Sequence, residues 1–163
     1  MRRVLWLLLP AAALAADLAS KAWVLRTLAE GQSRPVIKGF FYLTPGFNRG
    51  AIFGSLTWLP ETARYILFAL AGLAALVYFG MLLLAKATST WDRVAMGLIL
   101  GGALGNGLDR ILRGAVVDFL DFYFGTWQYW TFNLADSCIL VGAFLYALRM
   151  LLAPKAEQRT SGP

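Results

Sequence analysis

Four long runs of apolar residues, separated by polar or mixed segments, divide the chain. A helix that crosses the hydrocarbon core of a bilayer needs about 20 residues, and four runs are long enough: about 4–25, 65–85, 94–113 and 131–152. We therefore predict an all-α integral membrane protein with four transmembrane helices in a single domain, residues 1–153. The polar segment 154–163 is predicted to be a disordered tail.

The first apolar run has two interpretations. Arg2 and Arg3 precede an apolar stretch that ends in alanines, which is typical of a cleavable secretory signal peptide. The helical pattern, however, continues through Asp17 and Lys21 to about Leu25, and the two charged residues are spaced i, i+4 on one face. We favour a retained first transmembrane helix. From spacing alone, the charged pair could serve function or could only make the helix insertable.

Residues 31–60 interrupt the helical pattern and predict a small β element outside the membrane. Val36–Thr44 is rich in β-branched and aromatic residues, Pro45-Gly46 is a turn signal, and residues 47–54 form a second strand-like run. In that run Asn48 and Gly50 suit the docking of an extended peptide through backbone hydrogen bonds. An ordinary hairpin with an asparagine in its turn is an equal alternative.

Composition supports the membrane interpretation and narrows the chemistry. The chain is 59% hydrophobic, above the roughly 45–50% of soluble proteins. Its net charge of +6 comes from scattered Lys and Arg, which suit anionic membrane lipid and form no nucleic-acid-binding face. The absence of His and the presence of a single Cys argue against His-based catalysis, disulfides and the common zinc sites. We therefore predict no metal and no cofactor.

The third apolar run carries the strongest polar signal. Asn106, Asp109 and Arg110 fall at i, i+3 and i+4, so one helical face holds an amide, a carboxylate and a guanidinium. Such groups within a membrane are costly and usually functional, although an ion pair that locks two helices is the alternative. We expect Arg110 to hold Asp109 ionised. Four glycines, at 101, 102, 105 and 107, predict close packing of another helix.

The depths of the charged residues indicate one site. At 1.5 Å per residue, Asp17, Asp109 and Asp136 each lie roughly 20–24 Å from the face that holds the termini. In a core about 30 Å thick these three groups share one layer near the opposite face. Asp118 and Asn48 can reach the same layer from outside the helices.

Several carboxylates without histidine favour a pair that shares one proton, in which one carboxyl polarises a carbonyl and the other activates water. Asp118 and Asp136 are the best candidates. Asp118 follows two valines and precedes Phe119, so its apolar surroundings should raise its pKa, and Asp136 starts a helix beside Asn133. Asp121 is the main competitor, but it lies in the aromatic segment 119–130, which predicts an interfacial belt.

Other classes of function are less consistent with the pattern. A small transporter or proton pathway would spread its charges through the depth of the membrane. A Ser/Lys peptidase is disfavoured because Ser20 and Lys21 point about 100° apart on a helix. Cys138 lies near Asp136 but on a different face, with no base beside it.

Five motifs in order give the chain a specific resemblance to the bacterial lipoprotein signal peptidases, signal peptidase II. They cover nearly the whole chain except the tail: Asp17-Leu-Ala-Ser-Lys21, Asn48-Arg-Gly-Ala-Ile-Phe53, the glycine-rich run 101–110, Val116-Val-Asp-Phe119 and Phe132-Asn-Leu-Ala-Asp136. The resemblance implies an aspartic endopeptidase that cuts prolipoproteins before their diacylglyceryl-modified cysteine. It places the catalytic pair on Asp118 and Asp136, and supporting roles on Asp17, Lys21, Asn48, Asn106, Asp109, Arg110 and Asn133.

The resemblance also implies a location and partners. Counting Lys and Arg leaves the orientation open, whereas the family has both termini, and hence the tail, in the cytoplasm and the site near the outer face of the inner membrane. Lipid-modified prolipoproteins are the implied substrates, and globomycin-type peptides the implied inhibitors. Leu18 and Ile52 depart from the family pattern, where Gln and a small residue are common.

Overall fold

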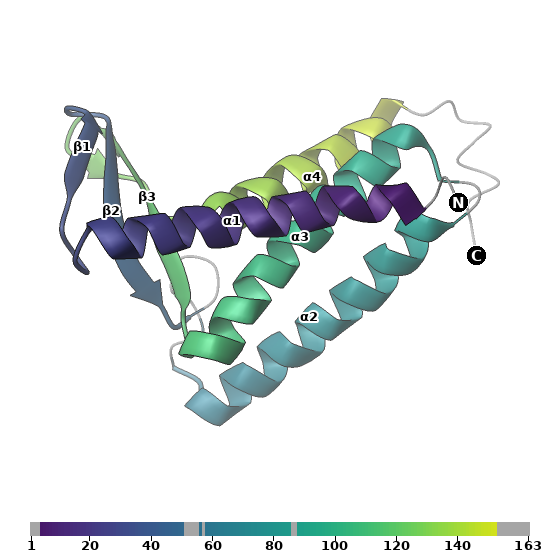
Figure 1. Cartoon of the computed structure of the whole chain (residues 1–163), viewed down its shortest axis with the longest axis horizontal. Coiled ribbons are helices and arrows are strands. Elements are labelled where there is room, and N and C mark those ends of the chain that lie inside the picture. The colour runs from purple at the N-terminus through teal and green to yellow at the C-terminus, as the bar shows by residue number, and fades with distance from the viewer. Residues whose placement is uncertain (1–3, 51–55, 57, 86–87, 153–163) are drawn as a thin grey trace.

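The computed structural model describes residues 4–50, 56, 58–85 and 88–152. Four long helices run side by side, and a small β-sheet lies at one end of the bundle (Figure 1). The first helix begins and the last helix ends at the opposite end of the bundle. The predicted tail 154–163 and residues 51–54 of the predicted second strand lie outside the described residues.

The helices match the four predicted apolar runs within a few residues. Their bounds are α1 Leu8–Thr27, preceded by a short 3₁₀ turn η1 at Val4–Leu7, α2 Glu61–Leu84, α3 Thr90–Arg113 and α4 Leu134–Leu152. Local signals set the ends of α3: the Ser89 side chain accepts a hydrogen bond from the Asp92 N–H, and Gly114 adopts a left-handed conformation at φ 71°.

Helix α3 is the centre of the bundle, because α1, α2 and α4 all pack against it. A Cβ added at Gly101 would meet Pro10 and Ala13 of α1, and one at Gly102 would meet the Ala135 carbonyl of α4. Gly105 lies against the Asp17 carboxylate. The prediction of close packing is confirmed at these three glycines, whereas nothing contacts the Cβ position of Gly107.

Three of the four helices are long and apolar enough to cross a membrane: the segment Val4–Thr27, α2 and α4. The buried face of α3 lowers its hydropathy, since Asp92, Asn106 and Asp109 all point into the protein. The chain is therefore a membrane protein with at least three helices of spanning character. The fourth span stays a prediction.

The β element is larger than predicted. Its four antiparallel strands are β1 Arg34–Ile37, β2 Phe41–Asn48, β3 Val116–Phe124 and β4 Trp127–Gln128, in that spatial order. Half of the sheet thus comes from the segment between α3 and α4, so a sheet confined to residues 31–60 is wrong. The predicted turn at Pro45-Gly46 is also wrong, because β2 runs through it with a register irregularity between Leu43 and Gly46, and the chain turns at Gly39 instead.

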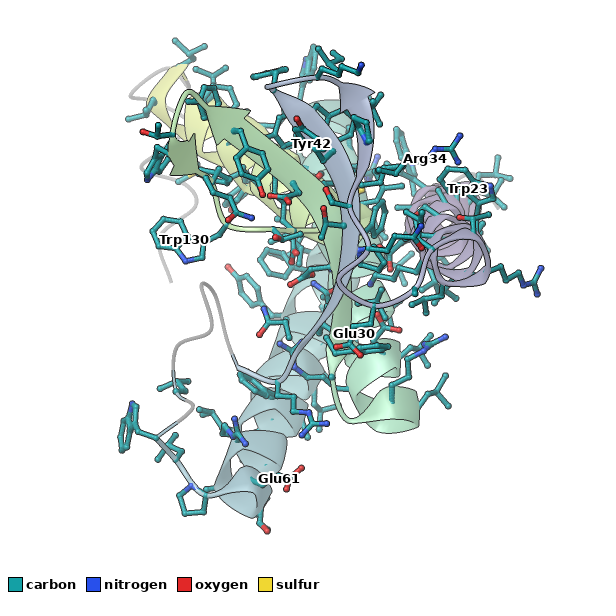
Figure 2. All side chains as sticks on the ribbon, turned by 90° about the vertical axis from the view of Figure 1, so that its left-hand side faces the viewer. Trp23, Glu30, Arg34, Tyr42, Glu61 and Trp130 are labelled. Atoms are coloured by element: carbon teal, nitrogen blue, oxygen red, sulfur yellow. The ribbon has the colours of Figure 1, made fainter. Side chains whose placement is uncertain are left out.

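The two faces of the sheet have different neighbours. Figure 2, seen from the sheet end, shows it between Trp23 of α1 on one side and Trp130 on the other. On the α1 side, Val24 and Leu28 pack against Phe119. On β3, Asp118 shares the opposite face with Phe122, which stacks on Phe41 and Phe132. The sheet therefore fixes one end of β3 against α1 and turns Asp118 toward α3 and α4.

Candidate active site

A fully buried group of three charges joins α1 to α3. Lys21 Nζ lies 2.7 Å from Asp17 Oδ2 and 2.9 Å from Asp109 Oδ2, and none of the three side chains is more than 1% exposed. The i, i+4 spacing on α1 supplies one contact and helix packing the other. We call Asp17, Lys21 and Asp109 the charged triad. A buried cation flanked by two carboxylates fixes the register of the two helices.

Asp109 also holds the start of β3, and its partners differ from the prediction. Asp109 Oδ1 pairs with Arg113 Nη1 at 2.5 Å, and Asp109 Oδ2 accepts the Val117 N–H at 3.2 Å. Arg110, which we expected beside Asp109, instead donates to the Gly50 carbonyl at 3.1 Å and lies 4.3 Å over the Phe68 ring. Adjacent residues on a helix do not face each other, and this explains the correction.

Two asparagines connect the charged triad to the candidate catalytic carboxylates. Lys21 Nζ donates to Asn106 Oδ1 at 3.1 Å, which turns the Asn106 amide so that its Nδ2 donates to Asp136 Oδ1 at 2.7 Å. Asn133 Nδ2 lies 3.1 Å from Asn106 Oδ1 and 2.7 Å from Asp118 Oδ1. Each amide has a single orientation that satisfies its neighbours, so the N–H groups face the aspartates.

The N-terminus of α4 positions Asp136. Asn133 Oδ1 accepts the Asp136 N–H at 2.8 Å, and Asp136 Oδ2 accepts the Asn133 N–H at 3.2 Å, which is a reciprocal capping box. The backbone N–H of Ala135, also in the first turn of α4, donates to Asp17 Oδ1 at 2.9 Å. Two carboxylates therefore meet the positive end of this helix.

Asp118 lies on β3 opposite Gly46 and is 5% exposed. Asn48 Nδ2 donates to its Oδ2 at 3.0 Å, so its two oxygens receive amides from Asn48 and Asn133. Burial raises the pKa of Asp118 to about 6, and the like charge of Asp136 adds to the rise. The two amides and the charge of Lys21 oppose it. This carboxyl is therefore poised to hold a proton nearer neutral pH than an ordinary aspartate.

Asn48 and Gly50 form a bend beside Asp118. Asn48 Oδ1 accepts the Gly50 N–H at 2.9 Å, which leaves its Nδ2 for Asp118, and the Gly50 carbonyl accepts Arg110. The structure thus brings together every predicted site residue: Asp17, Lys21, Asn48, Gly50, Asn106, Asp109, Arg110, Asp118, Asn133 and Asp136. The predictions missed Arg113 and the Val117 N–H. The i, i+4 spacing of Asp109 and Arg113 was the signal for the first.

The competing residues point elsewhere. Asp121 is fully buried, but its oxygens accept Tyr123 Oη at 3.2 Å and Gln128 Nε2 at 2.8 Å, on the face of β3 opposite Asp118. Ser20 Oγ donates to the Asp17 carbonyl and not to Lys21. Cys138 is a half-buried free thiol. Within the described residues, no group of three or more His, Cys, Asp or Glu could hold a metal ion.

Comparison with known proteins gives the family of this site. The model of the signal peptidase (SPase) II family matches residues 9–152. The chain belongs to the signal peptidase II family. Membership makes it a hydrolase of the aspartic peptidase type.

Individual relatives agree with this family. A lipoprotein signal peptidase of Serratia proteamaculans is 42% identical over 158 residues, which cover 96% of this chain and 92% of the relative. One from Xylella fastidiosa is 39% identical, with 96% and 94% covered, and one from Escherichia coli is 38% identical, with 94% and 93% covered. The similarity therefore extends over nearly the whole of this chain and of each relative.

Two solved bacterial membrane enzymes share the fold of this signal peptidase II family member. The first has a TM-score of 0.80 at 29% identity and covers 90% of this chain and 87% of its own. The second has a TM-score of 0.79 at 29% identity, with 91% and 94% covered. The arrangement of helices and sheet is thus shared by membrane enzymes.

Proposed function

We propose that this signal peptidase II family member is an intramembrane aspartic endopeptidase whose water-activating pair is Asp118 and Asp136. It removes the signal peptide from diacylglyceryl-modified prolipoproteins by cutting before the lipid-modified cysteine. The observation that carries the proposal is that Asn133 contacts both aspartates. Its side-chain amide donates to Asp118, and its backbone N–H donates to Asp136. One residue therefore holds both carboxyls toward the same space.

The two carboxyls receive different roles from their surroundings. Asp118, whose pKa is raised to about 6, holds the proton and donates it to the scissile carbonyl oxygen. Asp136, at the N-terminus of α4, takes a proton from water as the water oxygen attacks the carbonyl carbon. The tetrahedral intermediate then breaks at the C–N bond: the leaving amine takes the proton that Asp136 accepted, and one hydroxyl of the intermediate returns its proton to Asp118 as the carbonyl re-forms.

Asn48, Gly50 and Arg110 border the pair and can meet an extended peptide. Each already uses part of its hydrogen-bonding capacity to hold its neighbour, so the bend is preformed. We propose that this bend contacts the substrate backbone near the scissile bond, where globomycin-type peptides would compete. The charged triad supports the pair from behind without touching substrate, which requires that α1 be retained in the mature protein.

The proposed location follows from the same arrangement. The sheet and both aspartates lie at one end of the bundle, and α1 begins and α4 ends at the other (Figure 1). We propose four spans in the bacterial inner membrane, with both termini in the cytoplasm and the site near the outer face. A proton pathway is disfavoured, because the buried charges collect at the sheet end apart from the Asp92–Arg149 pair near the opposite end.

Incubation of the purified protein with two forms of one prolipoprotein tests this function. The lipid-modified form should be cleaved, with mass spectrometry locating the new N-terminus at the modified cysteine. The unmodified form is the control and should remain intact. Cleavage of neither form, or cleavage of both at a position away from the cysteine, would overturn the proposed substrate.

A further inference from the structure

A hollow at the sheet end of α2 contains three arginines and one glutamate. We call it the arginine hollow, and its lining residues are Arg49, Glu61, Arg64, Phe68, Arg110 and Gly114. It lies at the first turn of α2, where Figure 2 places Glu61, below the sheet in that view. Even with Glu61 counted, the hollow carries an excess of positive charge.

Two of the three guanidinium groups are held by backbone carbonyls. Arg64 Nη1 donates to the Arg49 carbonyl at 3.2 Å, and Arg110 Nη2 donates to the Gly50 carbonyl at 3.1 Å. Asp17, Asp92 and Asp109 form their ion pairs with Lys21, Arg149 and Arg113, and not with an arginine of the hollow. Arg64 Nε is buried without a hydrogen-bond partner. A buried donor left unsatisfied is costly, so this Nε favours a ligand that carries a hydrogen-bond acceptor.

Two further features define that acceptor. The N-cap residue of α2, Pro60, makes no side-chain capping bond, so the first amides of the helix add positive potential beside the arginines. Helix α2 is also nearly all exposed and strongly apolar, as a lipid-facing helix is. Its first turn therefore lies at the level of the lipid headgroups.

We propose that the arginine hollow binds the phosphate of an anionic phospholipid. Guanidinium groups match phosphate oxygens in bidentate geometry, and the unsatisfied Nε of Arg64 gains an acceptor. The excess positive charge selects a lipid with net negative charge over a zwitterionic one. Phe68 and the apolar side of α2 continue from the hollow along the path of the acyl chains.

The bound phosphate would also support the candidate active site. It would hold Arg110 in place, and Arg110 contacts the Gly50 carbonyl while the Gly50 N–H donates to Asn48. Asn48 in turn contacts Asp118 at 3.0 Å. The binding proposal itself rests on the hollow alone, so it can be tested without any cleavage assay.

Native mass spectrometry of the purified protein in neutral detergent provides the test. With phosphatidylglycerol or phosphatidylcholine added, the protein should retain phosphatidylglycerol about tenfold more strongly. Arg64→Gln should lower this retention about tenfold, and Arg49→Gln gives a second variant should the first fail to fold. Arg34→Gln, an exposed arginine of β1 outside the hollow, is the matched control and should retain the lipid as the wild type does.

Three results would overturn the proposal. Equal retention of the two lipids would show that the hollow does not select net charge. Wild-type retention in folded Arg64→Gln and Arg49→Gln would place the lipid elsewhere. Displacement of phosphatidylglycerol by millimolar inorganic phosphate would identify the occupant as a free anion and not a lipid.

Discussion

The charged triad and the Asp118–Asp136 pair lie side by side in one layer of the molecule, yet they are held in opposite ways. Asp17 and Asp109 face a buried lysine at 2.7 and 2.9 Å. Asp118 and Asp136 receive neutral amides, and among the described residues no cation lies within ion-pair distance of either.

The difference separates support from chemistry. The carboxylates of the triad are tied to a buried cation, which fixes α1 against α3. The carboxyls of the pair are held by amides, which fix their positions without a charge partner. Lys21 acts on both regions, because its contact with Asn106 orients the amide that holds Asp136.

The largest effect is expected from removing either member of the pair. Asp118→Asn or Asp136→Asn removes the acid or the base, and each should lower the cleavage rate about 10²–10⁴-fold per folded protein. Asp121→Asn is the matched control, since it changes a buried carboxyl of the same strand outside the site. Loss of activity in the control together with robust turnover by either pair variant would move the assignment to Asp121.

Breaking the charged triad should lower the stability of the fold more than the cleavage rate per folded protein. Lys21→Met leaves Asp17 and Asp109 buried without their shared cation, which should cost about 3–5 kcal/mol of stability and lower the yield of folded protein. Thermal unfolding in detergent measures this loss. Lys38→Met, at an exposed position, should unfold like the wild type. A Lys21→Met protein with wild-type stability would show that the triad is not a support.

A smaller effect on rate is expected from a single amide. Asn48→Ala removes the donor to Asp118 Oδ2, a hydrogen bond to a carboxyl group, and should lower turnover about 10–100-fold while the protein stays folded. Gln128→Ala is the control, because it removes an amide from Asp121. An unchanged cleavage rate in Asn48→Ala would show that the Asn48–Gly50 bend has no role in cleavage.

The smallest effect is a pH dependence of stability. The pKa of Asp118 rises from 3.8 to about 6 on folding, so its contribution is present below pH 3.8 and is lost as the pH rises through about 6. The loss is on the order of 1–3 kcal/mol. Thermal unfolding between pH 4 and 7 should therefore show a shallower decline in Asp118→Asn than in the wild type.

The sequence predicted the shared layer because helix geometry converts residue number into depth. The depths of Asp17, Asp109 and Asp136 could be predicted from the rise per residue and the positions of the helix ends alone. The partner of Asp109 could not be read in the same way, because packing decides which of several nearby cations faces inward. Arg113 and Lys21 face it, and the adjacent Arg110 turns toward Gly50.

The sheet was underpredicted for a different reason. The aromatic segment after Asp118 has the composition of an interfacial belt, and although aromatic residues also favour strands, nothing local identifies a pairing partner. Its partner, β2, lies far earlier in the chain, as in the pair Asp118 and Gly46. Long-range strand pairing is fixed by tertiary packing, and so are the contacts that Asn48 makes.

A double-mutant cycle on the two aspartates tests the central claim most directly. The cleavage rate of a lipid-modified prolipoprotein is measured for Asp118→Asn, Asp136→Asn and the double variant, each normalised to folded protein. If the two carboxyls act as one unit, the double variant should lose little more activity than either single variant. Losses that multiply would contradict this account, because they would show that Asp118 and Asp136 act independently.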